Sequence, residues 1–360
     1  MTQLPVRPRL AYFDQWTDPV AGTVLADHGG FDVTRLEVTG DVDTNWAALE
    51  SAHGYQSLIR TELARNPGVA EQWLTGTHLL ERCPDLLAVC SAGAGYDVID
   101  VDACTAAGVI VCNNSGPGRE AVAEHALGFM LALAKKISLA DRMIRRDVVQ
   151  DRSALRSSEL LGKTLGIVGL GQIGGRLVEL CAPFAMTVLA YDPYLSEADA
   201  GARGATKVDL DELLERSDFV HLNCPLTSET VGLIGREQFA RMKSTAFFVT
   251  TARGPVHDEV ALYDALVAGA IAGAGIDVFH DEPPDPAHPL LTLDTVVASP
   301  HTAGITVEAT RDIALATAEQ WITIFAGKVP QRLINHDAWP AYSDRFAARF
   351  GARPSEEPDR

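Results

Sequence analysis

Short apolar runs alternate with stretches of helical periodicity between Arg9 and Asn113. The runs read RLAYF, FDVTRLEV, SLIR, LLAVC and VIVCN, and turns that contain Gly, Asp or Pro separate them. Strands that alternate with helices are typical of a parallel sheet covered by helices. The pattern therefore predicts a first α/β domain in this part of the chain.

A second series of the same kind begins at Thr164. Its predicted strands are TLGIV, MTVLAY, DFVHL, AFFVT, AGAGIDVF and TVVAS. Helices are expected between these strands, one beginning at Gln172 and one over the segment EVALYDALVAG. This alternation predicts a doubly wound α/β domain.

Two further helices are predicted outside these series. Residues 120–137 are apolar on nearly every face, as in a helix packed on both sides between domains or subunits. Residues 306–325 form the other helix, with Glu308 in its first turn and Gly327 where a C-cap glycine belongs. Because one helix cannot form a domain, we expect it to pack on the first domain. The residues after His336 show little periodicity and predict an extended tail.

Composition agrees with a globular protein of two domains. The chain has 360 residues, which is more than one hydrophobic core usually spans, and 47% of them are apolar. The formal net charge of -18 disfavours nucleic acid and membrane surfaces as partners, because both carry negative charge.

The cysteines and the start of the chain indicate the compartment. Six cysteines lie far apart without a CxxC pair, which favours neither a zinc site nor a disulfide framework. They are Cys83, Cys90, Cys104, Cys112, Cys181 and Cys224. The first residues lack the continuous apolar segment of a secretory signal. We therefore expect a protein of the reducing cytoplasm, with no bound metal.

A glycine-rich turn follows the predicted strand TLGIV. In Gly169-Leu170-Gly171-Gln172-Ile173-Gly174 the first glycine permits a tight turn, the second lets a pyrophosphate approach, and the third lets helix and strand pack closely. The N-terminus of the following helix offers unpaired N–H groups to the phosphates. Asp192, at the end of the next strand, is placed to bind an adenosine ribose and favours NAD over NADP. The alternatives are a chance turn or a site for another nucleotide.

Three polar residues follow other strands of the same predicted sheet. Arg253 comes after AFFVT, Glu282 after AGAGIDVF and His301 after TVVAS. Ligands of open α/β sheets bind outside the carboxyl ends of the strands, so these side chains are expected to converge beside the nicotinamide.

Together these three side chains suit the reduction of a 2-keto acid. A guanidinium such as Arg253 can hold the substrate carboxylate. The oxygen that becomes an alkoxide must receive a proton from a group that titrates near neutral pH, for which His301 is the candidate. Glu282 can orient the imidazole and favour its protonated form. Taken singly, each residue has a structural alternative as a surface ion-pair partner, a packing histidine or a solvated loop charge.

In the first predicted domain, residues 91–97 (SAGAGYD) follow the strand LLAVC. Small residues there allow a tight loop whose N–H groups can hold a carboxylate. A simple turn is equally compatible with this composition.

These motifs resemble the D-isomer-specific 2-hydroxyacid dehydrogenase family from about Ser57 to Gly327. The matching segments are AGAGYDVID, AVAEHALGFMLAL, LGKTLGIVGLGQIG, YDPY, CPLTSET, TARGP, GIDVF with EPP, and SPHTAG. Formate dehydrogenases share this layout but pair the histidine with Gln, so Glu282 argues against that activity.

The resemblance implies roles for individual residues. Arg253 is the implied substrate arginine, and Glu282 and His301 are the implied catalytic acid pair. The implied carboxylate loop consists of Gly93, Ala94 and Gly95. The implied NAD-binding residues are Gly169, Gly171, Gln172, Ile173, Gly174, Asp192, Cys224, Pro225, Thr230, Thr251, Ala252, Asp277 and Gly304.

The implied activity is NAD(H)-dependent interconversion of a small D-2-hydroxy acid and its 2-keto acid, of the glyoxylate or hydroxypyruvate type. Arg60 resembles an arginine that phosphoglycerate dehydrogenases use for substrate anion recognition, so that activity is one alternative. An arginine that faces water at a strand end is the other interpretation of Arg60. An NAD(H)-sensing corepressor-like binding protein is the alternative outside enzymology.

The resemblance also implies the architecture. We expect an α/β protein with two doubly wound parallel-sheet domains, a Rossmann NAD-binding domain inserted into a flavodoxin-like substrate domain. The expected substrate domain covers residues 1–113 and 304–336, the NAD-binding domain residues 114–303, and the tail residues 337–360. A homodimer crossed by the helix that begins near Glu120 is expected as well.

Overall fold

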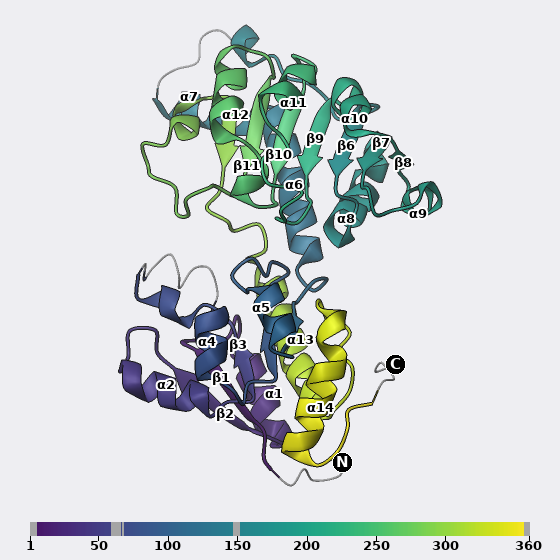
Figure 1. The fold of residues 1–360 in the computed structure, drawn as a ribbon. Helices are drawn as coiled ribbons and strands as arrows, with labels where there is room; N and C mark the ends of the chain where they lie inside the picture. The colour runs from purple at the N-terminus through teal and green to yellow at the C-terminus, as the bar shows by residue number, and fades with distance from the viewer. Residues whose placement is uncertain (1–5, 59–65, 67, 147–151, 356–360) are drawn as a thin grey trace. The chain divides into compact units, whose positions relative to one another are not determined.

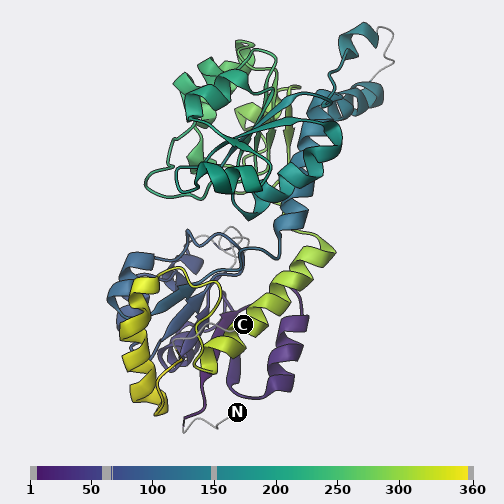
Figure 2. The same cartoon turned by 90° about the vertical axis from the view of Figure 1, so that its right-hand side faces the viewer.

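The computed structural model describes residues 6–58, 66, 68–146 and 152–355. It consists of two compact units, which Figures 1 and 2 show from two directions. The first unit comprises Met1–Gly118 and Val307–Arg360, and the second comprises Arg119–Thr306. The second unit is therefore an insertion in the sequence of the first.

The first unit contains a five-stranded parallel sheet. Its strands are β1 (Arg9–Phe13), β2 (Asp32–Leu36), β3 (Gly54–Gln56), β4 (Ala88–Cys90) and β5 (Ile110–Cys112). Their order in space is β2-β1-β3-β4-β5, the order of flavodoxin-like doubly wound sheets. The predicted fold class of this unit is thereby confirmed.

Alternating residues of these strands face two layers of helices. Leu10, Cys90 and Cys112 pack with α1 (Val20–His28), α13 (Val307–Phe325) and α14 (Trp339–Phe350). Their sequence neighbours, such as Ala11 and Val89, pack with α2 (Val42–Glu50), α4 (Thr77–Arg82) and α5 (Val101–Ala106). Helices α1 and α13 lie side by side on their face of the sheet (Figure 2). Both faces of the inner strands β3, β4 and β5 are buried, as parallel strands between two helix layers require, whereas four of the five residues of the edge strand β2 are exposed.

The strand predicted over SLIR is not observed at Ser57 and Leu58, and Ile59 and Arg60 lie outside the described residues. The observed strand β3 is Gly54–Gln56, and it ends before Ser57. A Cβ atom on Gly54 would lie 2.5 Å from the Trp321 ring, so the sheet meets α13 most closely at a glycine. The apolar pattern missed this strand because its three residues, Gly, Tyr and Gln, contain no aliphatic side chain.

The predicted extended tail at residues 337–360 is wrong for residues 339–350, which are helical. Helix α14 occupies Trp339–Phe350 and ends at Gly351, which has a φ of 74°. Tyr342, Phe346 and Phe350 recur every fourth residue and are buried in the first unit. This helical spacing was present in the sequence, but the many Arg and Asp residues around it obscured it. Helix α13 agrees with its prediction, including Gly327 with a φ of 69° beyond its end.

The second unit contains a seven-stranded parallel sheet. Its strands are β6 (Thr164–Val168), β7 (Thr187–Tyr191), β8 (Thr206–Lys207), β9 (Phe219–Leu222), β10 (Phe247–Thr250), β11 (Gly273–Ile276) and β12 (Val296–Ala298). The spatial order is β12-β11-β10-β9-β6-β7-β8, which reverses direction between β6 and β9. This is the doubly wound arrangement that the sequence predicts, with its switch point at the glycine-rich turn.

Two layers of helices cover this sheet (Figure 1). The layer with α6 (Arg119–Ala134), α8 (Gln172–Cys181) and α9 (Glu197–Ala202) packs on side chains such as Leu165 and Ile167. The opposite layer contains α10 (Leu210–Arg216), α11 (Arg236–Arg241) and α12 (Glu259–Val267), and packs on side chains such as Val220. Helix α7 (Ile137–Arg146) follows α6 and buries none of its residues. No described helix combines the length and the apolar content that crossing a membrane requires.

Candidate active site

The strand order brings three predicted site segments to one edge of the sheet. Arg253, Glu282 and His301 follow β10, β11 and β12, which are adjacent parallel strands. The glycine-rich turn and Asp192 follow β6 and β7, on the other side of β9. All five segments therefore leave the sheet at its carboxyl ends, where α/β sheets bind ligands.

His301 and Glu282 are in direct contact. The Nδ1 atom of His301 lies 2.7 Å from Oε2 of Glu282, and the two side chains are 30% and 14% exposed. The other oxygen, Oε1, accepts a hydrogen bond of 3.2 Å from the Phe279 N–H. A carboxylate in this place selects the tautomer that carries hydrogen on Nδ1 and leaves Nε2 for proton transfer. This arrangement is one that can carry out acid–base chemistry.

The backbone of His301 is held in a rare conformation. Its φ is 55°, in the left-handed region that non-glycine residues seldom adopt. Its N–H donates to the Asp277 carbonyl at 2.7 Å, while the Asp277 carboxylate accepts from Ser299 Oγ and from the N–H groups of Thr302 and Ala303. Asp277 is 1% exposed, so it fixes the loop that carries the imidazole. Its implied role in NAD binding stays a prediction.

Arg253 reaches this edge because of the glycine that follows it. A Cβ atom on Gly254 would lie 2.2 Å from the Phe279 backbone, so only glycine lets the two loops approach so closely. The Phe279 N–H also donates to Glu282, so the loop that carries Arg253 packs on the loop that carries Glu282. Arg253 is partly exposed, and its Nη1 donates to the Ala252 carbonyl at 2.7 Å.

The glycine-rich turn has the geometry that its sequence predicts. Gly169 has a φ of 95°, and a Cβ atom on it would lie 2.8 Å from the Cys224 nitrogen. A Cβ on Gly174 would lie 2.7 Å from the Gly169 carbonyl oxygen, whereas one on Gly171 would meet open space. Helix α8 begins after Gly171 without a side-chain cap, so its first N–H groups are available to an anion. These features fit a dinucleotide pyrophosphate.

Asp192 directly follows β7 and is partly exposed. Its Oδ2 accepts from the Leu170 N–H at 3.1 Å, and its Oδ1 accepts from the Tyr194 N–H at 3.0 Å. The carboxylate is therefore fixed beside the glycine-rich turn, and each oxygen has further acceptor capacity for a ribose hydroxyl.

The other implied cofactor residues lie along the same edge. Cys224 and Pro225 follow β9, and burial raises the pKa of the Cys224 thiol to about 11. Thr230 donates to the Pro225 carbonyl at 2.6 Å and so closes the turn after β9. The remaining ones are Gln172 and Ile173 in the first turn of α8, Thr251 and Ala252 after β10, and Gly304 after β12.

Two buried histidines of this unit were not predicted as site residues. His257 is fully buried, and burial, with a smaller contribution from His280, lowers its pKa to about 4. Burial alone lowers the pKa of His221 to about 4, and its Nε2 lies 3.2 Å from the Thr251 hydroxyl. Both imidazoles are therefore neutral at physiological pH.

The predicted carboxylate loop of the first unit is anchored through its carbonyl groups. The Asn113 side chain donates to the Ala94 carbonyl at 2.8 Å, and the Asn114 N–H donates to the Gly93 carbonyl at 2.9 Å. Among the described residues, no partner accepts from the N–H groups of Gly93, Ala94 or Gly95. The loop thus leaves donors for an anion. Sequence reasoning missed the two asparagines, although they directly follow the apolar run VIVC.

Arg60, which is similar to an arginine used for substrate anion recognition, lies outside the described residues. Its two interpretations are therefore both predictions still.

Comparison with known proteins identifies relatives of most of the chain. Residues 127–303 match the family model of the D-isomer specific 2-hydroxyacid dehydrogenase, NAD binding domain. A glyoxylate reductase of Korarchaeum cryptofilum is 41% identical over 262 residues, which are 72% of this chain and 79% of that protein. A D-3-phosphoglycerate dehydrogenase of Archaeoglobus fulgidus is 40% identical over 267 residues, 74% of this chain and 50% of that protein. The chain spans about half the length of the D-3-phosphoglycerate dehydrogenases that it matches.

Solved structures share the whole fold. A D-lactate dehydrogenase from Aquifex aeolicus, complexed with NAD and lactic acid, has a TM-score of 0.75 and 27% identity, covering 96% of this chain and 100% of that chain. A D-mandelate dehydrogenase of Rhodotorula graminis has a TM-score of 0.79 and 27% identity, covering 91% and 98%.

Proposed function

Because the chain belongs to the D-isomer-specific 2-hydroxyacid dehydrogenase family and contains its NAD-binding domain, we propose that it interconverts a small D-2-hydroxy acid and its 2-keto acid. The observation that carries the proposal is the 2.7 Å contact between His301 and Glu282. These residues follow β12 and β11, and Arg253 follows β10, the next strand of the same sheet. The glycine-rich turn beyond β9 supports NAD(H) as the cofactor.

When bound at the glycine-rich turn and Asp192, NADH would supply the hydride for C2 of the keto acid, and a side chain of the protein would supply the proton for its oxygen. The protein residues provide the rest. His301 gives the proton from Nε2 to the developing alkoxide. Glu282, which contacts Nδ1, orients the imidazole and favours its protonated form before the transfer. Arg253 holds the substrate carboxylate by charge-assisted hydrogen bonds. In the reverse direction His301 accepts the proton.

The direct test is the oxidation of NADH by the purified chain with glyoxylate, hydroxypyruvate, pyruvate and 3-phosphohydroxypyruvate. We expect turnover with at least one unphosphorylated keto acid. If NADH binds but none of the four acids is reduced, the binding-protein alternative replaces the proposal.

Phosphoglycerate dehydrogenase activity is the second candidate, favoured by the 40% identity to a protein of that name. It requires that 3-phosphohydroxypyruvate be the best of the four substrates.

Replacing Arg253 is expected to weaken substrate use. Arg253→Ala removes charge-assisted hydrogen bonds worth about 1.5–3 kcal/mol each, so kcat/KM for the keto acid should fall roughly 100-fold. Arg253→Lys keeps the charge but lacks the planar guanidinium, so its kcat/KM should lie between those of the wild type and Arg253→Ala. The matched control is Arg236→Ala, whose guanidinium is 71% exposed and pairs with Asp264. Equal kcat/KM in wild type and Arg253→Ala would remove this residue from the site.

Changing the charge of Asp192 is expected to alter cofactor choice. Asp192→Asn keeps an oxygen that can accept from the Leu170 N–H but removes the charge that repels a 2′-phosphate. The ratio of the NADPH Kd to the NADH Kd, measured by quenching of nicotinamide fluorescence, should fall about 10-fold. Asp199→Asn, at an exposed position of helix α9, is the control and should leave the ratio unchanged. An unaltered ratio in Asp192→Asn would place the adenosine ribose elsewhere.

The proposal includes a homodimer in the cytoplasm. All six cysteines are free thiols, which suits a reducing compartment. Ile137 and Ile144 on α7 are 56% and 70% exposed, which supports a partner subunit at that helix.

A further inference from the structure

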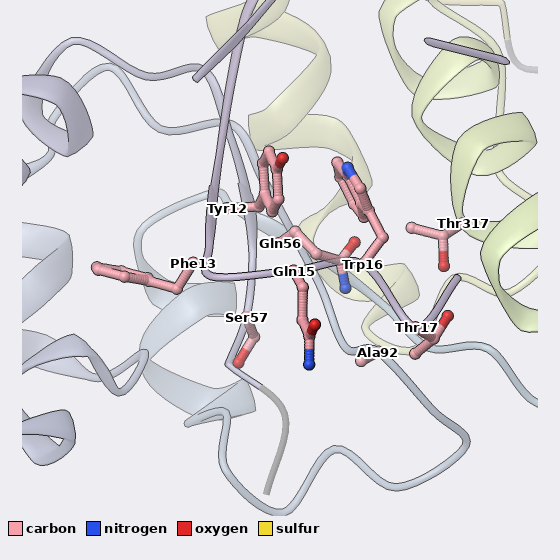
Figure 3. A pocket seen from close by; sticks show the side chains of 9 residues that line it. All are labelled: Tyr12, Phe13, Gln15, Trp16, Thr17, Gln56, Ser57, Ala92 and Thr317. Atoms are coloured by element: carbon pink, nitrogen blue, oxygen red, sulfur yellow. The ribbon is translucent and has the colours of Figure 1, made fainter. Parts of the chain in front are cut away.

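The first unit contains a small pocket between the loop after β1, the end of β3 and α13 (Figure 3). Its volume of about 20 Å³ is room for one or two water molecules. Gln56 in its wall donates to the Cys90 carbonyl, while the buried Ser57 hydroxyl has no hydrogen-bond partner among the described residues. This size and polarity suit a water molecule and not a substrate. Contacts with a consequence for the reaction lie in the second unit instead.

Glu282 lies in a loop of that unit without regular structure. Residues 277–288, between β11 and the 3₁₀ helix Pro289–Thr292, form neither helix nor strand. None of these described residues is therefore fixed by a helical or sheet ladder of backbone hydrogen bonds. The Glu282 carboxylate nevertheless lies at hydrogen-bond distance from His301. Other contacts must hold the loop in this place.

Glu259, the first residue of α12, binds the loop on both sides of Glu282. Its Oε1 accepts a hydrogen bond of 2.9 Å from the His280 N–H, two residues before Glu282. Its Oε2 lies 3.3 Å from Nε2 of His288, six residues after Glu282. The side chains of Glu259 and His288 are 13% and 21% exposed, so this contact is largely shielded from water. One carboxylate thereby ties both ends of the segment that carries Glu282.

Phe279 connects these contacts to the Glu282 carboxylate. Its N–H donates to Glu282 Oε1 at 3.2 Å, and its ring meets the His288 ring edge to face, with the centroids 5.4 Å apart. Phe279 is buried, and the residue after it, His280, is the one whose N–H is bound by Glu259. The backbone donor that fixes one oxygen of Glu282 is therefore held in place by Glu259 and His288.

The stability of helix α12 does not account for this arrangement. Asp258 is the N-cap of α12 and accepts from the Ala261 N–H at 2.9 Å, so the helix has its cap without Glu259. A carboxylate in the first turn also favours a helix through its charge, but it can do so while exposed to solvent. Glu237, in the first turn of the neighbouring helix α11, is exposed in this way. Glu259 instead gives both oxygens to the Glu282 loop.

From these contacts we infer that Glu259 is a positioning residue, which acts on proton transfer by His301 through the Glu282 carboxylate. This inference rests on the proposed function and extends its machinery to a residue outside the three predicted side chains. Without Glu259 the loop is free to move, and Glu282 orients the imidazole for a smaller fraction of the time.

The test is a double-mutant cycle on kcat for the reduction of the best keto acid with NADH. Glu259→Ala should lower kcat about 10-fold, whereas the Kd of NADH should change by less than about twofold. In a protein that already carries Glu282→Ala, the same substitution should lower kcat by less than about twofold, because no carboxylate is left to position. Glu259→Gln is isosteric and keeps an oxygen for the His280 N–H, so it should retain more of the kcat than Glu259→Ala. Glu237→Ala is the control and should match the wild type.

Two kinetic results would overturn the inference. One is a wild-type kcat in Glu259→Ala. The other is a loss of kcat by the same factor with and without the Glu282 carboxylate, since a general disturbance of the fold acts equally in both proteins.

The position of Glu282 can also be followed without turnover. The ¹H resonance of the His301 Nδ1–H, identified by its absence in His301→Ala, should shift or broaden in Glu259→Ala and stay unchanged in Glu237→Ala. An unchanged resonance in Glu259→Ala contradicts the inference even if the protein reduces no keto acid. Absence of turnover in the wild type defeats the proposed function instead, and the resonance then decides whether Glu259 positions Glu282.

Discussion

His301→Ala should lower kcat by about 100- to 10,000-fold, the range that general acid–base catalysis contributes. The imidazole is the group that Glu282 orients at 2.7 Å, and an alanine leaves the developing alkoxide without a proton donor. NADH binding, measured by quenching of nicotinamide fluorescence, should change by less than about twofold, because the glycine-rich turn follows a different strand.

The control for this variant is His336→Ala, at an exposed histidine of the first unit. Glu282→Gln completes the series, since it removes the charge beside Nδ1 and should cost less activity than the loss of the imidazole. If His301→Ala retains more than about a tenth of the wild-type kcat, another group protonates the product.

Lowering the pH below 6.5 should destabilise the second unit through His257. A variant that lacks this imidazole should lose less stability over the same pH range. The pKa of His257 is about 4 in the folded protein against an ordinary value of 6.5, because burial disfavours the charged ring. As the pH falls from 6.5 to 4, the unfolded chain takes up a proton that the folded protein does not, so unfolding becomes more favourable. The difference between the two pKa values corresponds to about 3 kcal/mol of unfolding free energy. The folded protein has this stability in full above pH 6.5 and has lost it by about pH 4.

The measurement is urea unfolding at several pH values for wild type and His257→Met, which fills a similar volume without an ionisable group. Between pH 7 and pH 4 the variant should lose about 3 kcal/mol less than the wild type. His336→Met, at an exposed position, serves as the comparison and should follow the wild-type curve. Parallel curves for wild type and His257→Met would show that the ring is protonated in the folded state or that water reaches it.

Much of the fold was predictable because the parallel strands are apolar on both faces. The runs TLGIV and AFFVT have no interpretation as surface helices, and the observed strands β6 and β10 coincide with them. The glycine-rich turn was predictable for a related reason. Each of its three glycines meets a separate steric requirement. Gly169 and Gly174 lie too close to other backbone atoms for a side chain, and Gly171 leaves open space where a ligand can approach. The contact of His301 with Glu282 followed from strand order, which the alternation of elements predicts.

Features that depend on contacts distant in sequence could not be predicted. The strand β3 pairs in the middle of its sheet although Gly54, Tyr55 and Gln56 carry no aliphatic signal. Its burial comes from distant segments, with Trp321 of α13 against Gly54 and Trp73 near Tyr55. The hydrogen bonds from the His301 loop to Asp277 depend on the adjacency of β11 and β12, which are separated in the sequence. The buried Ser57 hydroxyl has no hydrogen-bond partner among the described residues, and the sequence likewise does not indicate this.

The interrupted chain of the first unit has a consequence for biosynthesis. Strands β1 to β5 leave the ribosome first, but one face of their sheet is covered by α13 and α14, which are translated after the entire second unit. Until then Leu10, Cys90 and Cys112 lack part of their apolar cover, so the nascent first unit is the stage most exposed to aggregation and to chaperone binding. A stop codon before Trp339 would leave the part of the sheet face that α14 covers permanently exposed.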